Sequence, residues 1–237
     1  MAWYVMQAPM AGALSYLHEF LMVEYERIFG SEVMHRIDCT IYNDPSCSGP
    51  YCHYTYPALI RLHQESLDYW AQTVYQLSHE MTHYACFSVR GRPEGGLVWY
   101  EEILCEAMSL YALEYAASNW NKCWLYRINA GFDRMMREYL DDALNEWATG
   151  GLASCRTPRA LLAYEMARTA EIERSGYCRE RTRLYRAIRQ DPVAAGALPY
   201  YVNFIRPGSA VVDFAAWQRA NPYNPLLPVF ADIQPVK

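Results

Sequence analysis

Residues 77–83 read LSHEMTH, and the interpretation of the whole chain begins with this stretch. It places His79 and His83 four positions apart, with Glu80 directly after the first histidine. Side chains four residues apart stand on the same face of a helix, so both imidazoles can reach one metal ion. Imidazole nitrogen is a common ligand of Zn²⁺, and Glu80 is placed to exchange a proton with a water molecule beside that ion. The competing interpretation is a solvated helix face that happens to carry these three residues.

The surroundings of the motif favour a helix. Apolar side chains recur at helical spacing through Val74, Leu77 and Met81, which predicts a helix over residues 67–88. The segment ALIRLH at 58–63 predicts a short strand directly before it. The glycine-rich segment GRPEGG at 91–96 ends the first helix, and a second helix is predicted from 98 to about 117.

Strands are expected early in the chain and helices later. Upstream of the motif, the sequence predicts a helix at 13–29, a strand at 36–42 and a turn-rich loop at 43–57. This order favours an α+β fold, with a core at residues 1–117 and a helical lobe at 118–237 packed against it as one unit. Further helices are predicted downstream, followed by an extended proline-rich tail at 221–235; the helical segments are 120–148, 158–175, 177–190 and 211–220.

Composition narrows the class of protein. The chain has 237 residues, of which 52% are hydrophobic, so it is long enough to bury a core. A net charge of −5 is a poor match for general binding to nucleic acid or anionic membranes. The amino-terminal segment lacks the positive region of a signal peptide, and no run of 18 apolar residues occurs. With eight cysteines and no C-x-x-C pair, we expect a reduced, cytoplasmic protein, although export without a signal peptide fits the same sequence.

A catalytic metal site needs a third protein ligand. No histidine follows His83, and Cys39 lacks the glycine-bearing surroundings of an upstream cysteine ligand. A downstream carboxylate is the remaining option. Glu102 follows His83 after eighteen intervening residues, and Glu106 lies one helical turn further on the same face. Glu101 points about 100° away from Glu102, so we expect that these two cannot serve together.

The pattern His79-Glu80-x-x-His83, followed after eighteen residues by Glu102, resembles the gluzincin clan of zinc metallopeptidases, which includes thermolysin and aminopeptidase N. The spacing is similar to that of the aminopeptidases. Glu102-x-x-x-Glu106 is similar to the carboxylate pair on the glutamate helix of thermolysin, where the second acid is aspartate. The resemblance covers roughly residues 36–117.

This resemblance implies a zincin-like catalytic core with a small amino-terminal sheet, an active-site helix and a glutamate helix, followed by a mainly helical carboxy-terminal lobe. It implies Zn²⁺ as the cofactor, with His79, His83 and Glu102 as ligands and Glu80 as general base and then general acid. Glu106 would orient a ligand histidine through its free ring N–H. The strand at 58–63 would be the edge strand that holds a peptide or protein substrate. Because the G-x-M-E-N motif of exopeptidases is absent, endopeptidase activity is favoured.

Two other functions fit the same motif: a zinc-stabilised interaction protein on an inactive scaffold, and a zinc hydrolase of a non-peptide amide. The chain also lacks a downstream histidine to stabilise an oxyanion. Weaker signals include the loop Cys47-SGPY-Cys52-His53, best interpreted as a plain loop, and residues 156–189, whose nine arginines and four glutamates predict solvated helix faces. Candidate oxyanion donors are Tyr111, Tyr126, Tyr164, Tyr200 and Tyr201.

Overall fold

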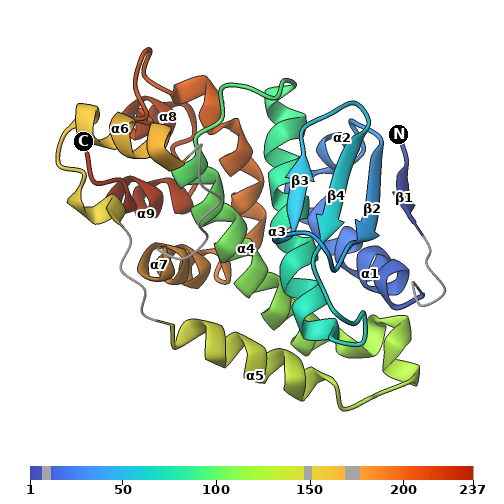
Figure 1. The fold of residues 1–237 in the computed structure, drawn as a ribbon. Helices are drawn as coiled ribbons and strands as arrows, with labels where there is room; N and C mark the ends of the chain where they lie inside the picture. Colours follow the sequence, from blue (N-terminus) through green and yellow to red (C-terminus); the bar gives the residue numbers. More distant parts are fainter. Residues whose placement is uncertain (7–11, 147–150, 169–176, 237) are drawn as a thin grey trace.

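In the part of the chain that the structure describes, every strand of the sheet lies before residue 65, and helices form most of the remainder (Figure 1). The computed structural model describes residues 1–6, 12–146, 151–168 and 177–236. The α+β class is therefore confirmed. The strands are β1 (Trp3–Val5), β2 (Cys39–Asn43), β3 (Tyr51–His53) and β4 (Ala58–Leu62). The helices are α1 (Gly12–Phe29), α2 (Ser31–Met34), α3 (Trp70–Arg90), α4 (Val98–Asn119), α5 (Asp133–Leu144), α6 (Pro158–Arg168), α7 (Cys178–Ile188), α8 (Phe214–Ala220) and α9 (Leu226–Ile233), with 3₁₀ segments at Trp120–Lys122, Trp124–Arg127, Gly151–Ser154 and Pro192–Phe204.

The four strands form one sheet in the order β1-β2-β4-β3. β1, β2 and β4 run parallel, and β3 pairs antiparallel with β4. Alternate side chains of the sheet are buried, including Ile41 of β2 and Ile60 of β4, because one face packs against α3. The sheet therefore serves as a platform that fixes one side of the helix carrying the histidine motif.

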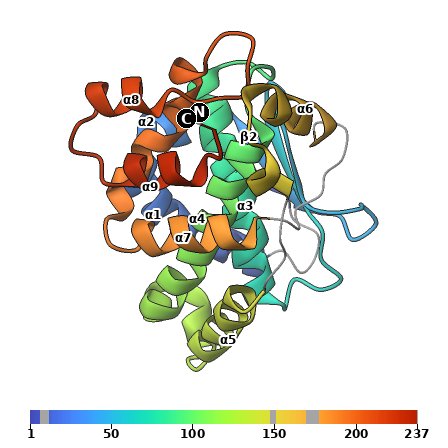
Figure 2. The ribbon, with the colours of Figure 1, turned by 90° about the vertical axis from the view of Figure 1, so that its left-hand side faces the viewer.

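α4 is the central helix of the molecule. It packs along α3 and also contacts α7 and α5, the latter lying below both α3 and α4 in Figure 2. Sixteen of its 22 residues are buried, as expected for a helix enclosed by other elements. The Glu165 carboxylate of α6 accepts hydrogen bonds from the first-turn backbone N–H groups of Val98 (2.5 Å) and Trp99 (3.1 Å). The carboxy-terminal half of the chain thus holds α4 in place from its first turn onward.

Several predicted elements differ from the structure. The loop expected at 43–57 contains β3, a strand too short to show alternation in sequence. Consequently the strand at 58–63 is not an edge strand, because β4 lies between β2 and β3. The tail expected to be extended contains α9, where Pro228 falls in the tolerated first turn and Phe230 stacks on Tyr100 (4.1 Å). The helix expected at 120–148 begins only at Asp133, and that expected at 158–175 extends beyond the described residues.

None of the described helices is long and apolar enough to cross a membrane. All eight cysteines have free thiols, and all but Cys47 are buried.

Candidate metal centre

The packing of α3 against α4 brings the two motif histidines against Glu102. His79 Nε2 lies 3.4 Å from Glu102 Oε2, and His83 Nε2 lies 3.2 Å from Glu102 Oε1. The two imidazole rings are neighbours on α3, with centroids 5.0 Å apart. The side chain of His79 is completely buried, whereas those of His83 and Glu102 are 10% and 14% exposed. Solvent therefore reaches the cluster at His83 and Glu102. The same nitrogen of each ring therefore points at one carboxylate.

The opposite nitrogen of each ring faces a different carboxylate. His79 Nδ1 lies 3.3 Å from Glu106 Oε1, and His83 Nδ1 lies 3.5 Å from Glu101 Oε2. The Tyr54 hydroxyl is 3.0 Å from His83 Nδ1 and donates to Glu101 Oε2 at 3.1 Å. Metal-binding histidines usually donate their second ring N–H to a carboxylate or carbonyl, which fixes the ring and its tautomer. In both rings Nδ1 faces a carboxylate, Glu106 for His79 and Glu101 for His83.

The geometry corrects one expectation about α4. Glu101 and Glu102 do serve together, because His83 has a nitrogen on each edge of its ring and one carboxylate contacts each edge. Behind these contacts, the carboxylate of Glu101 is held by Arg90 and by the Tyr201 hydroxyl (2.5 Å). Sequence reasoning missed Tyr54, and it proposed Tyr201 as an oxyanion donor, whereas the Tyr201 hydroxyl donates to Glu101.

Glu106 is held in a similar way. Its Oε2 accepts from Arg181 Nη1 at 2.5 Å and from the Tyr75 hydroxyl. Arg181 is 5% exposed, so the prediction of solvated faces for residues 156–189 is wrong at this position. Arg183, in contrast, makes an exposed ion pair with Asp232, and Arg189 makes a partly exposed one with Glu114. Residues 169–176 of that stretch lie outside the described residues.

The cluster carries an excess of negative charge. Leaving aside the exposed Glu146, which also pairs with Arg181, four glutamates (Glu80, Glu101, Glu102 and Glu106) face two arginines (Arg90 and Arg181), which leaves a formal charge of −2 when both histidines are neutral. Burial alone lowers the pKa of His83, but the carboxylates of Glu102 and Glu101 raise it to about 10. Burial likewise opposes ionisation of Glu102, yet the two histidines hold its pKa well below the usual range. A divalent cation would balance this charge with both rings neutral.

The donor atoms have spacings that suit a small metal ion. In a tetrahedral site with metal–ligand bonds of about 2.0–2.1 Å, ligand atoms lie about 3.3 Å apart. The measured distances from Glu102 to the two ring nitrogens, 3.4 and 3.2 Å, agree with that spacing. The two distances end on different oxygens of Glu102, Oε2 for His79 and Oε1 for His83, so this carboxylate contacts both ring nitrogens with spacings that a metal ion could share.

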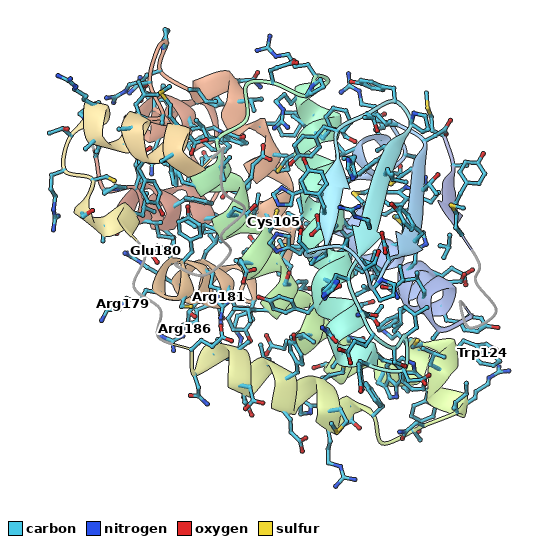
Figure 3. The ribbon with its side chains drawn as sticks, viewed as in Figure 1. Cys105, Trp124, Arg179, Glu180, Arg181 and Arg186 are labelled. Atoms are coloured by element: carbon cyan, nitrogen blue, oxygen red, sulfur yellow. The ribbon has the colours of Figure 1, made fainter. Side chains whose placement is uncertain are left out.

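Cys105 offers a further ligand that the sequence interpretation left out. Ligand atoms of His79, His83 and Cys105 all lie within 4.8 Å of one another, and this buried cluster could hold a metal ion. Figure 3 shows Cys105 on α4 at the centre of the molecule, where α4 meets α3. The sequence did contain a signal for this ligand: Cys105 follows Glu102 by three residues, so both side chains lie on the same side of a helix.

Glu80 lies on α3, the helix that packs against β3. Its side chain is 1% exposed. Its negative charge acts on two residues of β3. Burial raises the pKa of the Cys52 thiol, and the charge of Glu80 raises it further. Burial lowers the pKa of His53, and the charge of Glu80 partly opposes that decrease. The motif glutamate is thus a buried carboxylate on the helix against which the edge strand β3 packs.

Other candidates from the sequence lie elsewhere. Cys47 donates to the Gly49 carbonyl (3.1 Å) and, in the part of the chain described, does not join Cys52 and His53 in a metal cluster. Among the candidate oxyanion donors, Tyr201 bonds to Glu101, Tyr111 to Glu24 and Tyr164 to Tyr177, whereas Tyr126 and Tyr200 are exposed.

Comparisons with protein families, curated proteins and solved structures found no match for this chain.

Proposed function

We propose that this chain is a zinc-dependent metallopeptidase, with His79, His83 and Glu102 as zinc ligands on a zincin-like core. One observation carries the proposal: the Nε2 atoms of both histidines converge on Glu102 while each Nδ1 is backed by a separate carboxylate. A solvated helix face would need no such backing, and the resemblance to gluzincins suggests the same three ligands.

Glu80 would act as general base and then as general acid. When bound, zinc would supply a Lewis acid that lowers the pKa of water and polarises the substrate carbonyl. The Glu80 carboxylate is adjacent to His79 and nearly buried, so it would accept the proton of the attacking water and pass it to the departing amine. The low exposure of the cluster strengthens its electrostatic interactions with reacting groups.

The free edge of β3 is the proposed substrate-binding strand. β3 pairs only with β4 among the described strands, and it packs against α3, the helix that carries Glu80. An extended peptide can add to such an edge through backbone hydrogen bonds, which would place a peptide bond near Glu80. Hydrolysis within peptides or proteins is therefore the proposed reaction, with endopeptidase action favoured.

The experiment compares Glu80→Gln with Glu94→Gln, a matched change at an exposed position in the 91–96 loop. Zinc content and cleavage of a quenched fluorescent peptide library are measured for both variants and the wild type. Because general bases contribute about a hundredfold to ten-thousandfold, Glu80→Gln is expected to bind zinc and lose turnover by that factor. Glu94→Gln should cleave like the wild type. Full turnover by Glu80→Gln would show that the mechanism is wrong.

The Cys105 thiol favours a second candidate function. If Cys105 binds zinc together with His79, His83 and Glu102, all four tetrahedral positions are filled by protein. Such a closed site stabilises a fold and performs no hydrolysis, which corresponds to a zinc-stabilised interaction protein. The identity of the ligands distinguishes the two functions.

A further inference from the structure

We propose that Arg181 of α7 is a positioning residue for the metal site: it anchors Glu106, which orients His79. The inference rests on the proposed metal-binding function and adds to it a residue from the carboxy-terminal half of the chain. Arg181 lies 75 residues from Glu106 in sequence, so this contact exists only in the folded protein.

The guanidinium of Arg181 is held on several sides by different helices. Nη1 donates to Glu106 Oε2 of α4 (2.5 Å) and to the Tyr75 hydroxyl of α3 (3.1 Å). Nη2 donates to the Ala143 carbonyl of α5 (2.8 Å) and to Glu146 Oε2 (2.7 Å). In Figure 3, Arg181 lies on the side of α7 towards Cys105, whereas Arg179 lies on the far side. The side chain is therefore fixed where four helices meet.

Anchoring one oxygen of Glu106 directs the other. Oε2 is taken by Arg181 and Tyr75, which leaves Oε1 facing His79 Nδ1 at 3.3 Å. A carboxylate held at this distance favours a proton on Nδ1, which would leave the lone pair of His79 Nε2 for the metal. Arg181 thereby selects the ring orientation and the tautomer that a metal ligand needs.

A purely structural role explains this arrangement poorly. A buried ion pair often contributes no more stability than well-packed apolar side chains of the same volume, because both charges lose their hydration. The second histidine has the same arrangement. Arg90 forms an ion pair with Glu101, and Glu101 faces His83 Nδ1. Two buried arginine–glutamate pairs, each ending on the Nδ1 of a motif histidine, point to control of the histidines.

The test compares Arg181→Met with Arg183→Met in the full chain. Arg183 lies two residues further along α7 and makes an exposed ion pair with Asp232 (2.7 Å), so it controls for loss of an arginine from this helix. Zinc affinity is measured by competition with a chromogenic chelator. The tautomer of His79 is measured in the zinc-free protein by ¹⁵N NMR of the imidazole nitrogens, a signal that overall stability does not set.

Arg181→Met is expected to weaken zinc binding about tenfold to a hundredfold, the usual effect of losing a group that orients a ligand. It should also replace a single Nδ1–H form of His79 by a mixture, while Arg183→Met matches the wild type in both. A folded Arg181→Met protein with wild-type zinc affinity and an unchanged tautomer would overturn the proposal.

Arg181→Lys covers the case in which Arg181→Met does not fold. Lysine keeps the positive charge but cannot make the same set of contacts to Glu106, Ala143 and Glu146. Weaker zinc binding and a mixed His79 tautomer in this variant would support the proposal, and wild-type values would overturn it. If the wild type binds no zinc, the metal-site proposal fails, and the His79 tautomer alone decides whether Arg181 orients this ring.

Discussion

Removing Glu102 and Cys105 one at a time identifies the third metal ligand. Glu102 directs one oxygen at each Nε2, at 3.4 and 3.2 Å, whereas the Cys105 thiol lies within 4.8 Å of the same histidines. The metallopeptidase account requires Glu102 as a ligand and Cys105 as a buried neighbour. Glu102→Ala and Cys105→Ala therefore have opposite expected outcomes.

The size of the effect follows from the number of ligands. Structural zinc sites with four ligands bind with an apparent free energy of about 10–16 kcal/mol, or about 3 kcal/mol per ligand. Loss of Glu102 should thus weaken zinc binding by about a hundredfold or more. Glu106→Ala should weaken it less, by about tenfold to a hundredfold, because in the proposed site Glu106 contacts the far nitrogen of His79 and does not bind the metal. Cys105→Ala should stay within about threefold of the wild type.

Zinc affinities are measured by chelator competition, and Co²⁺ is then substituted for zinc in each protein. A thiolate ligand gives Co²⁺ a strong near-ultraviolet charge-transfer band, which should be absent from both the wild type and Cys105→Ala. A large loss of affinity in Cys105→Ala, with that band present in the wild type, would refute the open catalytic site. A large loss in Glu106→Ala with none in Glu102→Ala would reverse the roles of the two glutamates.

Two further predictions concern stability. His18 of α1 packs against Trp3 (5.1 Å), and burial, with a smaller effect of His35, lowers its pKa to about 4. In the unfolded chain this histidine has a pKa of about 6.5, so the unfolded state binds the proton more readily than the folded state. The free energy of unfolding should therefore fall by about 3 kcal/mol as the pH drops from 6.5 to 4. In urea titrations, His18→Leu should remove that part of the pH dependence. Glu165→Ala should lower the free energy of unfolding by about 1–3 kcal/mol, since two N–H groups at the start of α4 lose their acceptor; an unchanged urea midpoint would show that this carboxylate contributes nothing.

The parts of the fold that could be predicted are those with long, regular patterns. α3 and α4 were expected from helical periodicity, and glycines at 91–96 separate them. The fixed spacing of His79 and His83 within α3 places both rings on one face, which is why local sequence was sufficient for them. The same argument put Glu102 and Glu106 on one side of the next helix.

Elements that depend on tertiary contacts could not be predicted. β3 has three residues and exists because it pairs with β4, and α9 forms where Phe230 packs against Tyr100. Arg181 reaches Glu106 across 75 residues, and nothing local distinguishes it from the other arginines nearby. The residues that orient the two histidines were therefore largely beyond sequence reasoning, whereas the histidines themselves were not.

The central claim is that this cluster binds zinc, and the most direct test is elemental analysis of the wild type and His79→Ala, each purified without chelator or metal resin. The account predicts about one zinc per wild-type chain, as expected for a single site, and its loss in the variant. A wild-type protein that holds no metal, even after dialysis against zinc, would contradict it.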